Sequence, residues 1–123
     1  MKEHKNYYPD ISYVNKIHCK TISLDNFFSS NNIEHKKYNF LNIDVQGAEM
    51  LVLKGCIETL KYIDAIYIEV NFKEIYENNS YKKDVDIFLN SYGFELCNIV
   101  DSGYGWGDAL YIKTEKKKKK NSI

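Results

Sequence analysis

The sequence predicts an α/β fold whose first strands are parallel and whose last strand is antiparallel. Two β-rich runs, residues 40–45 and 65–70, stand on either side of a helical segment that begins at Gly47. A strand, a helix and a strand within about 30 residues form a βαβ unit, and the two strands of such a unit are parallel. Two later runs, at 94–100 and 109–112, are joined by a connection too short to hold a crossover helix. These last two strands should therefore pair antiparallel.

The first helix is predicted from apolar residues at helical spacing and from the residues that begin and end it. Ser23 is a suitable cap, and Asp25 lies in the first turn, where the helix dipole favours a negative charge. The apolar face consists of Leu24, Phe27 and Phe28. The polar cluster at 29–32 ends this helix.

Two further helical regions follow along the chain. The helical segment of the βαβ unit opens at 47–49, stops or kinks at Gly55 and resumes through Leu60. A last helix follows the polar stretch 71–80 and is terminated by Gly93. Its apolar stripe consists of Val85, Phe88, Leu89 and Tyr92. We interpret this stripe as part of the core.

The strands of the βαβ unit have the composition of buried strands. The run at 40–45 predicts a strand that is largely buried yet carries two polar side chains, and the continuous run at 65–70 is typical of a strand covered on both faces. The connection at 101–108 holds three glycines at alternate positions, but no helix follows it, as a phosphate-binding loop requires. We therefore predict a flexible turn there.

Composition and charge disfavour several classes of protein. With 123 residues and 44% hydrophobic content, the chain forms one compact domain or part of one. All seventeen basic residues are lysines, and without the planar fork of arginine, sequence-specific nucleic-acid binding is disfavoured. No apolar stretch approaches a signal peptide or the ~20 residues that span a bilayer. The widely spaced Cys19, Cys56 and Cys97 lack zinc-site spacing and indicate reduced thiols in a cytoplasmic protein.

The chain divides into three segments. Residues 1–15 are expected to form an irregular lead-in, 16–113 the folded domain, and 114–123 a disordered tail rich in lysine. The run at 116–120 holds five of the positive charges, so residues 1–115 carry a net charge of −5. We interpret the tail as solvated, with an electrostatic handle for RNA or an anionic membrane as the alternative.

Acidic side chains end two strands that are predicted to be neighbours. Asp44 ends the first strand and Glu69 the second, and in an open α/β sheet ligands bind beyond the carboxyl ends of the strands. A carboxylate held there can act as a general base, a metal ligand or an acceptor of a ligand's hydrogen bond. For Asp44 the alternative is a cap on the helix that follows. The histidines have no metal-ligand spacing and are predicted to be solvated: His4, His18 and His35.

A set of short motifs resembles, in order and spacing, a known family. The motifs lie at 21–25, 40–49, 52–55, 68–70, 92–94 and 107–110. The most specific are Asp-Val-Gln-Gly-Ala-Glu at 44–49 and Val-Leu-Lys-Gly at 52–55. Over about residues 17–113 the pattern is similar to the C-terminal half of the FkbM family of S-adenosylmethionine-dependent methyltransferases. The resemblance implies a partial Rossmann-like sheet of the class I methyltransferase type, S-adenosylmethionine as cofactor, and O-methylation of a hydroxyl on a sugar, glycan or other small metabolite.

The same resemblance implies roles for particular residues. Asp44 and Glu69 are the candidate catalytic residues, with Asp44 as the base for the acceptor hydroxyl or as its orienting partner. The residues expected near substrate or cofactor are Gln46, Gly47, Glu49 and Asn71. Gln46 stands where many relatives have glutamate. No metal is predicted as a fixed component, although the oxygens of Asp44, Glu69 and Asn71 are of the type that a divalent cation accepts.

One part of the family's fold has no counterpart in the sequence: the glycine-rich loop after the first strand, with the acidic residue that holds the ribose of the cofactor. The strands then correspond to the fourth through seventh of the full sheet, and the strand at 40–45 has an open, apolar edge. We expect that edge to be covered by the lead-in, by another copy of the chain, or by a separate N-terminal half. The competing hypothesis is a non-catalytic remnant that acts as an interaction module through this edge.

Overall fold

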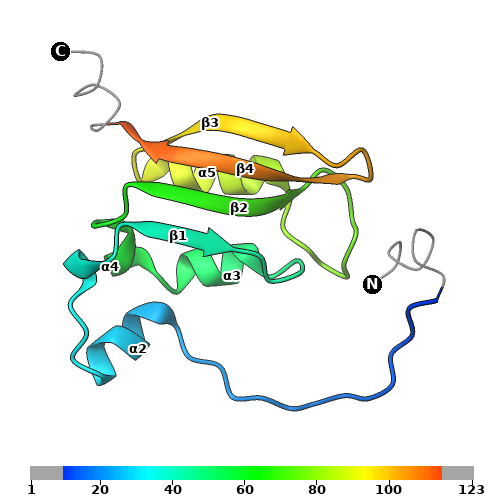
Figure 1. The fold of residues 1–123 in the computed structure, drawn as a ribbon, viewed down its shortest axis with the longest axis horizontal. Helices are drawn as coiled ribbons and strands as arrows, with labels where there is room; N and C mark the ends of the chain where they lie inside the picture. The colour runs from blue at the N-terminus through cyan, green and yellow to red at the C-terminus, as the bar shows by residue number, and fades with distance from the viewer. Residues whose placement is uncertain (1–9, 115–123) are drawn as a thin grey trace.

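The computed structural model describes residues 10–114 of the chain (Figure 1). The predicted lysine run, most of the predicted lead-in and His4 lie outside these residues. The helices are α2 (Leu24–Ser30), α3 (Glu49–Lys54), α4 (Ile57–Leu60) and α5 (Lys82–Ser91), with a 3₁₀ turn, η1, at His35–Lys37. The strands are β1 (Phe40–Ile43), β2 (Ala65–Asn71), β3 (Phe94–Asp101) and β4 (Trp106–Lys113).

The four strands form one mixed sheet in the order β1-β2-β4-β3. β1 and β2 are parallel, with Ile43 opposite Ile68, and α3 and α4 lie in the connection between them, as expected of a βαβ unit. β4 lies between β2 and β3 and is antiparallel to both. The predicted α/β fold, with parallel strands and an antiparallel last strand, is confirmed.

The hydrophobic core lies between one face of the sheet and the helices α3, α4 and α5 (Figure 1). Alternate residues of β2, namely Ile66, Ile68 and Val70, are at most 1% exposed. They belong to one cluster with Leu53 of α3 and Leu89 of α5. Because side chains alternate along a strand, the intervening residues of β2 point to the opposite face. No helix in the described part of the chain is both long and apolar enough to cross a bilayer.

β1 is shorter and more exposed than the sequence indicated. The predicted strand at 40–45 ends at Ile43, and Ile43 is the one buried residue of its four, whereas Phe40 is 53% exposed. The prediction of a largely buried strand is wrong because β1 stands first in the strand order, with β2 on one side only among the described strands. The prediction that β2 is covered on both faces fails at Tyr67, which is 37% exposed.

The helices begin and end at the predicted residues. Ser23 Oγ accepts a hydrogen bond from the backbone N–H of Asn26 at 3.2 Å, and Asn31 caps the other end of α2. The helical segment after β1 breaks at Gly55 into α3 and α4. Gly93, with a φ of 83°, follows the end of α5. Local sequence signals therefore determine where these helices stop.

The hairpin between β3 and β4 is tighter than the predicted connection at 101–108. β4 begins at Trp106, and the backbone N–H and the hydroxyl of Ser102 both donate to the carbonyl of Trp106, at 3.0 and 2.6 Å. The turn is therefore confined to 102–105. The prediction was too long because Trp106 and Asp108 continue the alternation of the strand and pair with β2.

Candidate functional site

Three carboxylates meet at the carboxyl ends of β1 and β2. Asp44 follows β1, Glu69 lies near the end of β2, and Glu49 is the first residue of α3. One oxygen of each lies within 4.8 Å of one oxygen of the other two. The parallel pairing explains the meeting, because Asp44 and Glu69 follow the register pair Ile43 and Ile68. We call Asp44, Glu49 and Glu69 the carboxylate cluster.

Glu49 is fully buried, and only one of its two carboxylate oxygens forms hydrogen bonds. Its Oε1 accepts hydrogen bonds from the backbone N–H groups of Val45 and Gly47, at 3.3 and 3.0 Å. Its Oε2 is buried and has no hydrogen-bond partner. The alternative role for Asp44, as a helix cap, is not observed, because Asp44 Oδ1 instead accepts a hydrogen bond from Gln46 Nε2 at 2.6 Å.

The turn between β1 and α3 is closed by the connection that follows β2. Gln46 and Gly47 both have positive φ, 55° and 104°. A Cβ added to Gly47 would lie 2.9 Å from Tyr76 Cβ, so the turn fits only glycine there. The Tyr76 hydroxyl donates a hydrogen bond to Gln46 Oε1. Two of the residues predicted to lie near a ligand therefore contact Tyr76 of the same chain: Gln46 through its hydrogen bond, and Gly47 through close packing.

Glu69 and Asn71 lie on the same face of β2, two residues apart, and are 8% and 1% exposed. Both amide atoms of Asn71 are buried without a hydrogen-bond partner. Burial raises the pKa of Glu69 to about 7, and the negative charges of Asp44, Glu49 and Asp108 add to that effect. The structure therefore brings the predicted acidic residues together, and their chemical roles stay predictions.

Asp108 is a further acid beside the carboxylate cluster, and it was not identified from the sequence. The β2–β4 register places it opposite Glu69, and burial together with Asp44 raises its pKa. No local signal marked it, because the alternation of buried and half-buried residues that places Asp108 in β4 is visible only in the structure. Within residues 10–114, no lysine forms an ion pair with these acids. The site is therefore strongly negative.

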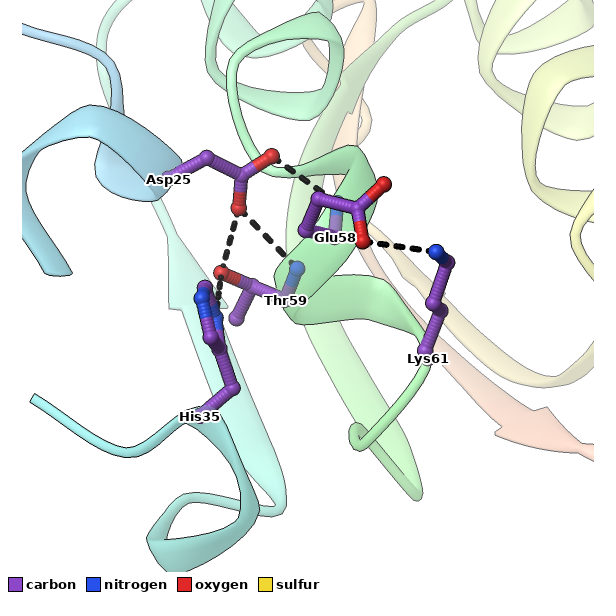
Figure 2. Close-up of polar contacts among 5 residues, drawn as sticks. All are labelled: Asp25, His35, Glu58, Thr59 and Lys61. Atoms are coloured by element: carbon purple, nitrogen blue, oxygen red, sulfur yellow. Dashed lines mark hydrogen bonds and ion pairs between the residues drawn. The ribbon is translucent and has the colours of Figure 1, made fainter. Parts of the chain in front are cut away.

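A second polar cluster lies between α2, η1 and α4 (Figure 2). Asp25 accepts hydrogen bonds from the backbone N–H groups of Glu58 and Thr59, at 2.8 and 3.0 Å, and from the Thr59 hydroxyl at 2.7 Å. His35 Nδ1 lies 2.9 Å from that hydroxyl, and the imidazole ring stacks on Tyr62. The prediction of a solvated His35 is wrong, because these contacts hold its ring. We call Asp25, His35 and Thr59 the cap cluster.

Neither the carboxylate of the cap cluster nor the thiol beside it is arranged for proton transfer. Burial acts to raise the pKa of Asp25, but hydrogen bonds from Thr59 and Glu58 outweigh it, and the pKa lies below its ordinary value of 3.8. Burial raises the pKa of Cys56 to about 12, and its Sγ donates to the Leu53 carbonyl. Asp25 stays charged and Cys56 stays protonated, which fits a structural role for both.

Comparison with known proteins identifies a family. Residues 2–96 match the family model described as a methyltransferase FkbM domain. No curated protein and no solved structure matches the chain. The match confirms the resemblance indicated by the motifs at 44–49 and 52–55. Because it covers more than half of the 123 residues, the chain belongs to the FkbM methyltransferase domain family.

Proposed function

We propose that the chain is an S-adenosylmethionine-dependent O-methyltransferase that acts on a hydroxyl of a sugar, glycan or small metabolite. Membership of a methyltransferase family supports the reaction class. One observation supports a role for this chain's own residues: Asp44 and Glu69 meet at the carboxyl ends of two parallel strands, which is where open α/β sheets bind ligands.

The two acids differ in exposure, and we assign them different tasks. Asp44 is exposed, so the hydroxyl of an acceptor can reach it, and it accepts the proton of that hydroxyl or orients the hydroxyl. Glu69 is held in the middle of three hydrogen-bonded strands, and its fixed position lets it align the acceptor. Proton removal makes a hydroxyl a better nucleophile, and alignment lowers the barrier further.

The described residues fit the acceptor side of this reaction and not the cofactor itself. S-adenosylmethionine, when bound, supplies the methyl group. Its adenosyl and methionine parts need a turn to which a ligand can come close, typically one with glycine between a strand and a helix. Within residues 10–114 the β1–α3 turn is the only strand-to-helix turn with a glycine, and Tyr76 packs directly on Gly47. We therefore assign no cofactor contact to these residues.

Calorimetric titration of the full chain with S-adenosylmethionine and with S-adenosylhomocysteine tests the proposal. The titrations are run in a chelator, so that metal ions do not contribute. Saturable heat with both compounds would support the methyltransferase. Absence of heat, together with self-association in sedimentation, would overturn the proposal and favour the interaction module.

Replacement of Asp44 tests the assigned role. Label transfer from methyl-tritiated S-adenosylmethionine to a panel of mono- and disaccharides should fall by about 100-fold or more in Asp44→Asn, since general base catalysis contributes on this order. Asp84→Asn is the matched control, because Asp84 is an exposed acid in the first turn of α5 and is not a member of the carboxylate cluster. Equal transfer rates in the two variants would contradict the role of Asp44.

The second candidate function is a non-catalytic module that binds through the sheet. β1 is at the edge of the sheet formed by the described strands, and Phe40 on it is 53% exposed. On the sheet face away from the core helices, Tyr67 and Val100 are 37% and 59% exposed. Exposed apolar side chains beside an unpaired edge favour association. In this alternative the partner is another copy of the chain or a separate N-terminal half.

A further inference from the structure

Within residues 10–114, two buried side chains carry polar atoms that make no hydrogen bond. Within the described residues these atoms are Glu49 Oε2 and both amide atoms of Asn71. Leaving such groups unsatisfied is costly, and native proteins rarely do so without a reason. Asn79, which is also buried, shows the usual arrangement: its Oδ1 accepts from two backbone N–H groups and its Nδ2 donates to two carbonyls.

The unsatisfied atoms lie where the acids gather. Glu49 is itself a member of the carboxylate cluster, and Asn71 lies two residues beyond Glu69 on the same face of β2. Glu49 cannot turn away, because its other oxygen holds the backbone N–H groups of Val45 and Gly47. Its free oxygen is therefore fixed and buried.

The spacing of the three carboxylates matches the coordination sphere of one ion. Their ligand oxygens lie within 4.8 Å of one another. Ca²⁺ binds oxygens at about 2.3–2.6 Å, so two oxygens on opposite sides of it are about 5 Å apart. Mg²⁺, with bonds of about 2.0–2.1 Å, requires them to be closer, at about 4 Å or less. The donor set contains only oxygens, which selects hard divalent cations over zinc or copper.

We propose that Asp44, Glu49 and Glu69 together bind one hard divalent cation of the size of Ca²⁺ or Mn²⁺. The side-chain oxygen of Asn71, Oδ1, is a further donor. The cation supplies the partner that Glu49 Oε2 lacks. It also balances a group of acids that no lysine of residues 10–114 pairs with. The proposal stands on this chain's residues and does not depend on methyl transfer.

The experiment is a calorimetric titration of the full chain with CaCl₂, MnCl₂ and MgCl₂ in the absence of any cofactor. We expect one saturable site per chain, with Ca²⁺ or Mn²⁺ bound more tightly than Mg²⁺. The dissociation constant should rise at least tenfold in Glu49→Gln and in Asp44→Asn. Glutamine retains the Oε1 that holds the turn, and Asp44 is exposed, so neither substitution removes a structural contact of the fold.

The controls are Glu34→Gln and Asp84→Asn, which neutralise exposed acids outside the cluster and should leave the dissociation constant unchanged. Mn²⁺ should also broaden the amide signals of Glu49 and Glu69 in NMR spectra and leave that of Glu34 sharp. The proposal is overturned if none of the three cations binds saturably at millimolar concentration. It is equally overturned if Glu49→Gln, Asp44→Asn and the controls all bind alike, since the ions then bind elsewhere.

Discussion

The cap cluster and the carboxylate cluster are both built around buried or half-buried acids, but they treat those acids in opposite ways. Asp25 accepts three hydrogen bonds from α4, and its pKa lies below the ordinary value. Glu49 and Glu69 face other acids, and one oxygen of Glu49 has no partner at all. An acid that is fully satisfied serves stability, whereas an acid that is buried and unsatisfied indicates a ligand.

The cap cluster supplies the N-terminal cap that α4 does not receive from its own N-cap residue. Cys56 stands at the N-cap of α4 and makes no side-chain cap bond. Asp25 performs that task from another helix, because it accepts from the second and third N–H groups of α4, those of Glu58 and Thr59. This contact ties α2 to α4 and thereby fixes the start of the chain's folded part against the βαβ unit.

The largest expected effect tests the turn that carries the carboxylate cluster. Gly47→Ala places a Cβ at φ 104° and 2.9 Å from Tyr76 Cβ, so strain and overpacking together should cost about 3 kcal/mol of unfolding free energy. Gly103→Ala is the matched control, because φ is 81° but nothing lies within 4 Å, and strain alone should cost about 1 kcal/mol. Urea denaturation measures both. Equal losses would show that Tyr76 does not hold this turn.

The next effect tests the cap cluster. Asp25→Ala removes the cap of α4 and should lower the unfolding free energy by about 2 kcal/mol, as the loss of an N-cap does. Asp10→Ala, at an exposed acid of the lead-in, should change it by less than about 0.5 kcal/mol. The two variants are compared by urea denaturation at pH 7. A loss in Asp25→Ala no greater than in the control would mean that the cap cluster adds nothing to stability.

The pH dependence of the same variant gives a second measurement. Because the pKa of Asp25 in the folded chain lies below 3.8, its contribution is complete above pH 3.8 and is lost as the pH falls through the folded value. The unsubstituted chain should therefore lose more stability between pH 5 and pH 3 than Asp25→Ala does. Parallel acid profiles would contradict this assignment.

The smallest effect has the opposite sign and belongs to the carboxylate cluster. The folded chain holds the Glu69 proton up to about pH 7, whereas the unfolded chain releases it near 4.5. Rising pH therefore destabilises the metal-free chain across that interval. Glu69→Gln removes a charge that Asp44, Glu49 and Asp108 repel, and should stabilise the chain by about 1 kcal/mol at pH 8.

The gain in Glu69→Gln should vanish at pH 5, where the folded carboxyl is already protonated. Glu34→Gln, at an exposed acid, is the control and should gain nothing at either pH. Urea denaturation in a chelator at the two pH values measures the difference. A loss of stability in Glu69→Gln at pH 8 would show that the negative charge of Glu69 is satisfied in the folded chain, contrary to our description.

Much of the fold could be predicted because its signals are local. The β-rich runs, the cap at Ser23 and the terminator at Gly93 are each read from a few neighbouring residues, and the structure places them as expected. The βαβ unit then predicts that Asp44 and Glu69 share one edge of the sheet. The exposure of β1 could not be predicted, because it depends on which strands lie beside it.

The hydrogen-bond partners of the acids could not be predicted from neighbouring residues in the sequence. Asp25 meets Thr59 across 34 residues, so its place in the first turn of α2 did not reveal its role. Glu49 was expected near substrate only through the family resemblance, and nothing local indicated that one of its oxygens would be buried without a partner. Asp108 was assigned to a turn, because its place in β4 depends on pairing with Glu69 of β2, which is distant in the sequence.

β2 is paired on both sides, to β1 and to β4, and this has a consequence for how the molecule opens. Amide protons in its centre should exchange with deuterated solvent more slowly than those of β1 or of the 72–81 connection, because interior strands open last. When the outer strands open locally, the backbone of β2 stays paired and keeps the spacing between Glu69 and Asn71 constant. A ligand that binds there therefore meets the same arrangement of these two side chains.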